Sequence, residues 1–124
     1  GAHPPSANIT PAPRADGRPA APAAAHAPKE IARRLQPAYA AAHNNLALIL
    51  ATQPSRRADA MAHYEIALRL LPNSAVIHFN LATELAKLPA RRDEAESHFA
   101  AALEIDPNFA AARTALQRLQ QPDR

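Results

Sequence analysis

Residues 43–72, HNNLALILATQPSRRADAMAHYEIALRLLP, return at an offset of 35 as residues 78–107, HFNLATELAKLPARRDEAESHFAAALEIDP. When residues 40–74 are laid over residues 75–109, 16 of 35 positions are identical. A fixed period of this size is typical of a solenoid, in which each unit buries its apolar face by stacking on the next unit. The repeat therefore predicts an array of stacked units.

The apolar residues within each copy follow a helical period. Leu46 and Leu50 lie four residues apart in the first half of the first copy, and Tyr64 and Leu68 do so in the second half. A proline stands between the halves and another follows the second half, where each one ends a helix. We therefore expect an all-α fold, with helices at about residues 38–52, 56–70, 74–88, 91–105 and 108–120.

Partial units flank the two copies. Residues 29–36 align with residues 64–71 at the same offset, which predicts a truncated leading helix. After the second copy the pattern continues but turns polar on one face, which predicts a helix that caps the array against water. The expected array thus covers residues 29–121: the truncated helix at 29–36, repeats at 40–74 and 75–109, and the cap at 110–121.

The first 28 residues have a different composition. They hold seven of the 13 prolines and both glycines, with no sustained apolar period. Segments rich in Pro and Ala bury too little apolar surface to offset the entropy of ordering. We expect residues 1–28 to be a disordered, partly polyproline-like linker or tail.

Composition restricts the function classes. The chain has no cysteine, so disulfides cannot stabilise it and its compartment stays open. No apolar run approaches the ~20 residues of a membrane span. The net charge of +3 is a weak argument for nucleic acid, and we expect neither a nucleic-acid partner nor a membrane span.

The pattern of both copies resembles the tetratricopeptide repeat, Trp-x2-Leu-Gly-x2-Tyr followed by Ala-x3-Phe, Ala and Pro. The matching residues of the first copy are His43-x2-Leu46-Ala47-x2-Leu50, Ala60-x3-Tyr64, Ala67 and Pro72. Those of the second copy are His78-x2-Leu81-Ala82-x2-Leu85, Ala95-x3-Phe99, Ala102 and Pro107. Ala replaces the usual Gly, His replaces Trp, and each interhelical turn has one extra residue. The resemblance implies a right-handed helical-hairpin solenoid of two full repeats, a partial leading helix and a C-terminal capping helix.

Four histidines recur with the repeat and invite a metal hypothesis: His43, His63, His78 and His98. We expect them to be partly buried packing residues instead, because no Cys, no acidic ligand at i+3 or i+4 and no H-E-x-x-H spacing accompanies them. No glycine-rich phosphate loop or activated nucleophile is found, so we expect no catalytic residue, no cofactor and no enzyme activity. The motif Pro-x-Arg-Arg in both copies predicts a basic edge, formed by Arg56, Arg57, Arg91 and Arg92.

In tetratricopeptide arrays the first helices line a concave groove. The resemblance implies that the groove here holds Asn44, Asn45, Leu48, Thr52, Val76, Phe79, Asn80, Thr83, Lys87 and Arg118. Asn45 and Asn80 recur, and an amide can both donate to and accept from a peptide backbone. The sequence Asn-Leu-Ala is similar to the asparagine ladder in the repeats of O-linked N-acetylglucosamine transferase and to bacterial tetratricopeptide proteins. The alternative is that the two amides bond to a neighbouring helix.

These patterns favour a protein-interaction scaffold that binds an extended peptide in the groove. The alternative is the substrate-docking tail of a longer enzyme, such as a bacterial glycosyltransferase. A purely structural spacer is a third reading. We also expect self-association through the truncated end, where Ile31, Tyr39 and Leu46 would be poorly covered.

Overall fold

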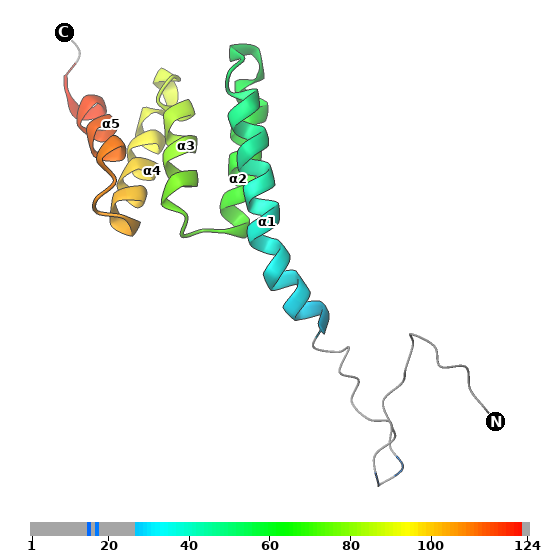
Figure 1. Cartoon of the computed structure of the whole chain (residues 1–124). Coiled ribbons are helices and arrows are strands. Elements are labelled where there is room, and N and C mark those ends of the chain that lie inside the picture. Colours follow the sequence, from blue (N-terminus) through cyan, green and yellow to red (C-terminus); the bar gives the residue numbers. More distant parts are fainter. Residues whose placement is uncertain (1–14, 16, 18–26, 123–124) are drawn as a thin grey trace. The chain divides into compact units, whose positions relative to one another are not determined.

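The computed structural model describes residues 15, 17 and 27–122, and within these residues every regular element is helical (Figure 1). The expected all-α class is therefore confirmed. The linker expected at residues 1–28 lies outside the described residues, apart from residues 15, 17, 27 and 28. The elements in order are α1 (Ala27–Leu50), η2 (Pro54–Arg56), α2 (Arg57–Leu70), α3 (Ala75–Leu85), η3 (Pro89–Arg91), α4 (Arg92–Ile105) and α5 (Ala110–Gln120).

The chain divides into two compact units, Gly1–Leu35 and Gln36–Arg124. In the first unit the start of α1 exposes Ile31 and Leu35. The second unit contains the rest of α1 and all later helices. The packing and the sites described below belong to this second unit.

Helix α1 corrects the expected boundary between a helix at 29–36 and another at 38–52. The helix runs without a break through Pro37, although a proline inside a helix costs roughly 3 kcal/mol. The equivalent turn after Pro72 continues with Asn73 and Ser74, and the Ser74 hydroxyl caps α3 by accepting from the Ile77 amide at 3.3 Å. After Pro37 comes alanine, the best helix former, and no residue that caps a helix follows it.

The two interhelical turns agree with the sequence prediction. Pro54 and Pro89 each begin a short 3₁₀ turn that leads directly into the following helix. Proline suits this position because its fixed φ matches the first helical turn and its missing N–H would have no partner there. The repeated prolines therefore set the end of one helix and the direction of the next.

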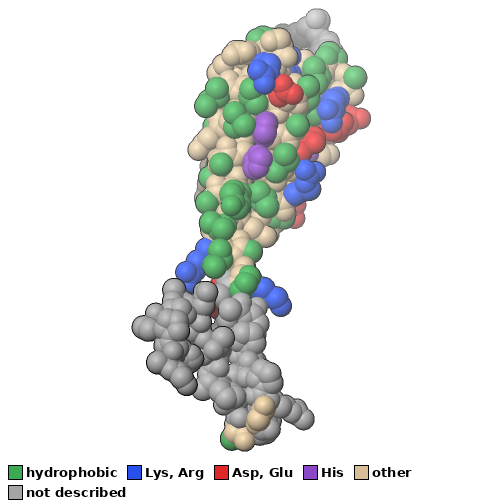
Figure 2. Space-filling view, turned by 90° about the vertical axis from the view of Figure 1, so that its right-hand side faces the viewer, with side chains coloured by type: hydrophobic (Ala, Val, Ile, Leu, Met, Phe, Trp, Pro, Cys, Tyr) green, Lys and Arg blue, Asp and Glu red, His purple; other side chains and the backbone are tan. Residues whose placement is uncertain are grey.

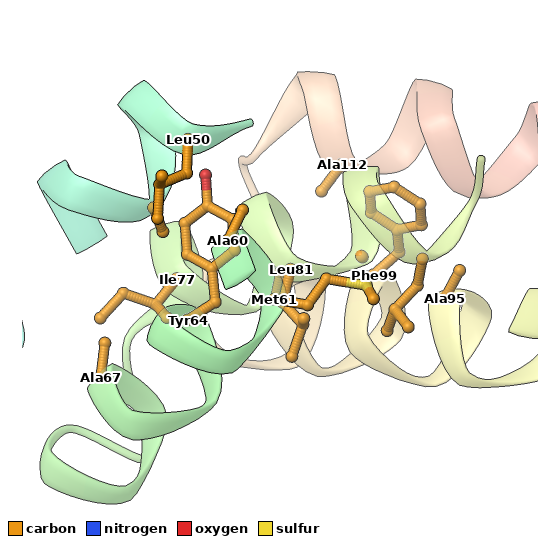
Figure 3. Packing of buried hydrophobic residues seen from close by; sticks show 14 of the residues in the cluster. Leu50, Ala60, Met61, Tyr64, Ala67, Ile77, Leu81, Ala95, Phe99 and Ala112 are labelled. Atoms are coloured by element: carbon orange, nitrogen blue, oxygen red, sulfur yellow. The ribbon is translucent and has the colours of Figure 1, made fainter. Parts of the chain in front are cut away.

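The core repeats with the sequence. Alanines at the same positions of both copies are completely buried: Ala47 and Ala82, Ala60 and Ala95, Ala67 and Ala102. Tyr64 and Phe99, which are also equivalent, are among the largest fully buried side chains (Figure 3). Small residues let the helix backbones approach closely, and each aromatic ring fills the space that remains.

Helices of the second unit pack in chain order. Helix α2 contacts α3, α3 contacts α4, and α4 contacts α5, so the last three form a row in Figure 1. Residues of α3, α4 and α5 line the candidate site.

Candidate functional site

A pocket of ≈ 530 Å³ lies between α3 and α5, and one residue of α4 also lines it. Its walls are mostly apolar, which suits burial of an apolar ligand group. The lining residues are Phe79, Thr83, Ala86, Phe99, Ala111, Thr114, Ala115, Arg118 and Leu119.

Three aromatic rings stabilise one wall of the pocket. The centroids of Phe79 and Phe99 are 5.7 Å apart, and those of Phe79 and Phe109 are 4.9 Å apart, both with tilted rings. Such tilted contacts are favourable beyond the area that they bury. Phe99 is fully buried, whereas Phe79 is only partly buried. The contacts with Phe99 and Phe109 therefore fix the Phe79 ring, which lines the pocket.

Arg118 is the single charged residue of this lining, and it is exposed. Its guanidinium offers a planar set of donors that matches a carboxylate. Thr114 is also exposed on the same wall, while the Thr83 hydroxyl donates to the Phe79 carbonyl at 2.8 Å. The pocket therefore combines an apolar interior with one cationic group.

The two repeated asparagines, Asn45 and Asn80, lie in different surroundings. The Asn80 amide Nδ2 donates to Asn44 Oδ1 at 3.0 Å, which links α3 to α1. Asn45, the sequence equivalent of Asn80, lies exposed. The bond to a neighbouring helix, which the sequence left open, thus holds for Asn80 with Asn44. One N–H and the carbonyl oxygen of Asn80 remain outside this bond.

Lys87, which was expected to add a positive charge to the groove, forms an ion pair with Glu84. Its Nζ is 3.2 Å from Glu84 Oε1 and 3.1 Å from Oε2. Glu84 is buried and also accepts from the Arg57 Nε of α2 at 3.4 Å. Burial, and next the charge of Glu84, raises the pKa of Tyr64 to about 12. This polar cluster joins α2 to α3.

The remaining groove candidates lie on the surface. Leu48 and Val76 are exposed apolar residues, and the exposed Thr52 donates its hydroxyl to the Ile49 carbonyl at 2.7 Å. The structure therefore gathers three candidates around the pocket, Phe79, Thr83 and Arg118, and bonds Asn44 to Asn80. Sequence reasoning missed Phe99 and Phe109 as site residues, because the repeat pattern explains Phe99 by packing and because the counterpart of Phe109 in the first copy is the polar Ser74.

The basic edge is largely charge-balanced. Arg56 pairs with Asp59 at 2.8 Å, and Arg91 pairs with Glu94 at 2.7 Å. The hydrogen bond from Arg91 lowers the pKa of Glu94 below its ordinary value. Since Arg57 lies against Glu84, this edge is a weaker candidate for an acidic partner than the sequence alone suggests.

The four histidines form two equivalent pairs. Nδ1 of His43 is 2.9 Å from Nδ1 of His63, and Nδ1 of His78 is 2.9 Å from Nδ1 of His98. Nε2 of His78 is also 2.8 Å from the Pro72 carbonyl oxygen, so donation to this oxygen leaves His78 Nδ1 as the acceptor in its pair. Figure 2 shows histidine side chains at the surface among apolar side chains. The described residues contain no group of three or more His, Cys, Asp or Glu that could hold a metal ion.

No protein-family model matches the chain, and no curated protein matches it. In the described part of the chain, no helix has both the length and the apolar character needed to cross a membrane. The functional assignment is therefore built on the pocket geometry.

Proposed function

We propose that the chain is a protein-interaction scaffold of the tetratricopeptide type, whose groove binds an extended peptide. In this proposal the helices form a right-handed solenoid of two helical hairpins, with α5 as the cap. The support is twofold: the same positions are buried at an offset of 35, and the helices of the second unit contact one another in chain order. The chain would act by binding and not by catalysis.

The pocket between α3 and α5 carries the proposal. Its volume and apolar walls suit one large apolar side chain of a peptide, such as Leu or Phe, resting on Phe79. Arg118 favours a carboxylate near that side chain, either an acidic residue or the C-terminus of the peptide. The preferred ligand is therefore an apolar residue with a neighbouring acid.

Asn80 extends this binding surface beyond the pocket. Its bond to Asn44 fixes the amide, which lowers the entropy that binding a peptide would cost. The remaining N–H and the carbonyl oxygen can bond to a peptide backbone without reading its sequence. In the proposed complex, Asn80 and the exposed Asn45 hold the backbone, and the pocket gives specificity.

Selection from a displayed library of random peptides, followed by calorimetry on the selected sequences, tests the proposal. Thr114→Trp should fill the pocket and weaken binding at least ~10-fold, since a tenfold loss corresponds to ~1.4 kcal/mol. Gln120→Trp is the matched control, because it adds the same ring to an exposed position of α5 outside the pocket. Arg118→Gln should weaken peptides that carry an acid and leave neutral ones unaffected.

Two results would contradict the assignment. One is selected peptides without an apolar residue whose binding survives Thr114→Trp. The other is loss of binding only when Arg56 and Arg91 are neutralised, which would move the site to the basic edge.

A further inference from the structure

Equivalent faces of α1 and α3 differ in what covers them. On α3, Ile77, Leu81 and Glu84 are only 4%, 2% and 4% exposed, and α3 packs against α2. Their counterparts at an offset of 35 are Ala42, Leu46 and Ile49 on α1. Leu46 is 42% exposed and Ile49 is 64% exposed, so the same register that is buried in the second copy is open in the first.

The open residues of α1 form one stripe. Tyr39, Ala42, Leu46 and Ile49 follow one another at spacings of three, four and three residues, which places them on a single helix face. Tyr39 is 55% exposed and Ala42 is also exposed. Figure 2, which views the side of Figure 1 where α1 and α2 lie, shows apolar side chains along this side.

The lack of charged residues around this stripe indicates which kind of surface would cover it. Residues 36–53 contain no Asp, Glu, Lys or Arg, so nothing on this part of α1 opposes its approach to a second copy. On α3 the acid Glu84 receives the Arg57 guanidinium of α2, whereas its counterpart on α1 is Ile49. An arginine-bearing helix such as α2 would leave its charge without a partner on α1, a costly result for a desolvated group. An uncharged apolar helix fits better.

The stripe is complementary to itself in the reverse direction. When two α1 helices cross antiparallel with the two-fold axis at the level of residue 44 along the helix, Tyr39 lies opposite Ile49 and Ala42 lies opposite Leu46. Each Leu46 side chain then meets the small Ala42 of the other copy, which allows the two helix axes to approach to the usual distance of about 8–10 Å. A two-fold interface requires this kind of self-complementary patch.

We propose that the chain forms a symmetric dimer in which the α1 stripe of one copy packs antiparallel on the α1 stripe of the other. The lining of the α3–α5 pocket includes no α1 residue, so the dimer would leave both pockets open. If the proposed peptide function holds, two pockets would bind a partner with two peptide segments more tightly than one pocket can. The dimer itself does not depend on that function.

Sedimentation velocity of the full chain over a micromolar concentration series tests the proposal. We expect a reversible dimer. Ile49→Glu and Tyr39→Lys should each weaken it on the order of 100-fold, because the symmetry introduces every charge twice. Ile105→Glu is the matched control, since Ile105 is an exposed apolar residue of α4 away from the stripe. Circular dichroism should show the same helix content in all variants.

The double variant Tyr39→Lys with Ile49→Glu tests the register. In the antiparallel pair each new Lys faces a new Glu of the other copy, so dimerisation should return to within about tenfold of the original. A parallel pair would place like charges together and stay dissociated. A monomer at every concentration, a dimer that Ile49→Glu leaves intact, a dimer that Ile105→Glu dissociates equally, or no recovery in the double variant overturns the proposal.

Discussion

The junction of α2 with α3 and the junction of α4 with α5 are equivalent in sequence but differ in chemistry. At the first, Tyr64 and the buried Glu84 form a polar cluster with Arg57 of α2. At the second, the corresponding residues are Phe99 and Leu119, and both line the apolar pocket. The first junction holds a charged, hydrogen-bonded cluster, whereas the second contributes apolar residues to the pocket between α3 and α5.

This difference separates the residues that build the fold from those that line the pocket. The buried alanines are the same in both copies, so the hairpin geometry does not depend on which junction is polar. The changes from Tyr to Phe and from Glu to Leu are two of those that make the later junction apolar. Under the proposed function, one repeat would serve as a structural joint and the next as a binding site.

The aromatic positions should show the largest effects on stability. Tyr64→Ala and Phe99→Ala each remove a fully buried ring, so each should lower the free energy of unfolding by ~3–5 kcal/mol. Urea unfolding followed by circular dichroism measures both. A loss below ~1 kcal/mol in either variant would mean that the two copies are not equivalent in their packing.

The buried alanines should show the next largest effect. Ala60→Leu and Ala95→Leu insert atoms where two helices are in close contact, which should cost ~1–3 kcal/mol in each copy. Ala62→Leu and Ala100→Leu are the controls, because these alanines lie exposed on the same two helices. If the controls destabilise as much as the buried variants, close packing is not the cause.

Much of the fold could be predicted from the sequence. The repeat fixes the helical halves, the proline turns and the alanine layers, because these depend on spacing and on local backbone preferences. The continuous α1 was not predicted, since the pattern alone does not show that Ala38 fails to end the helix as Asn73 does. The exposure of Tyr39 and Leu46 could be predicted, because the repeat pattern shows no full repeat before them.

The site was predictable only in part. Phe79, Thr83 and Arg118 follow from their place on the first-helix face, and the pocket brings them together. The bond between Asn80 and Asn44 depends on the offset between two helices, which no spacing within one helix determines. Similarly, the sequence places four histidines one repeat apart but does not show that they meet in pairs.

Exchanging the chemistry of one junction for that of the other should have a smaller effect. Tyr64→Phe with Glu84→Leu gives the α2–α3 junction the Phe and Leu of the α4–α5 junction, and Arg57→Met removes the guanidinium that would otherwise lose its acid. We expect this triple variant to change the unfolding free energy by no more than ~1.5 kcal/mol, because well-packed apolar groups often replace a whole buried ion pair without loss. Glu84→Leu alone should be worse than the triple variant, since it leaves the Arg57 guanidinium without its acid and the Tyr64 hydroxyl in an apolar site. Thermal unfolding compares the three proteins, and a triple variant less stable than the single one would show that the polar cluster is required.

The smallest effect should come from the histidine pairs, which are the same at both hairpins. Burial, and next the electrostatic interaction with His78, lowers the pKa of His98 below its ordinary 6.5, although Glu94 and Glu65 act in the opposite direction. Below pH 6.5 the unfolded chain therefore takes up a proton that the folded chain takes up only at lower pH. Stability should fall as the pH drops through this window and recover as it rises.

The physical reason is that the pair shares one hydrogen between two Nδ1 atoms, so a second proton breaks the bond. The loss should be about 1 kcal/mol, the net value of one hydrogen bond. Unfolding at about pH 7.5 and about pH 5 measures it, above the range in which ordinary carboxylates titrate. His98→Gln, which can bond but not titrate, should flatten the dependence. A pH dependence that His98→Gln leaves unchanged would place the titration elsewhere in the molecule.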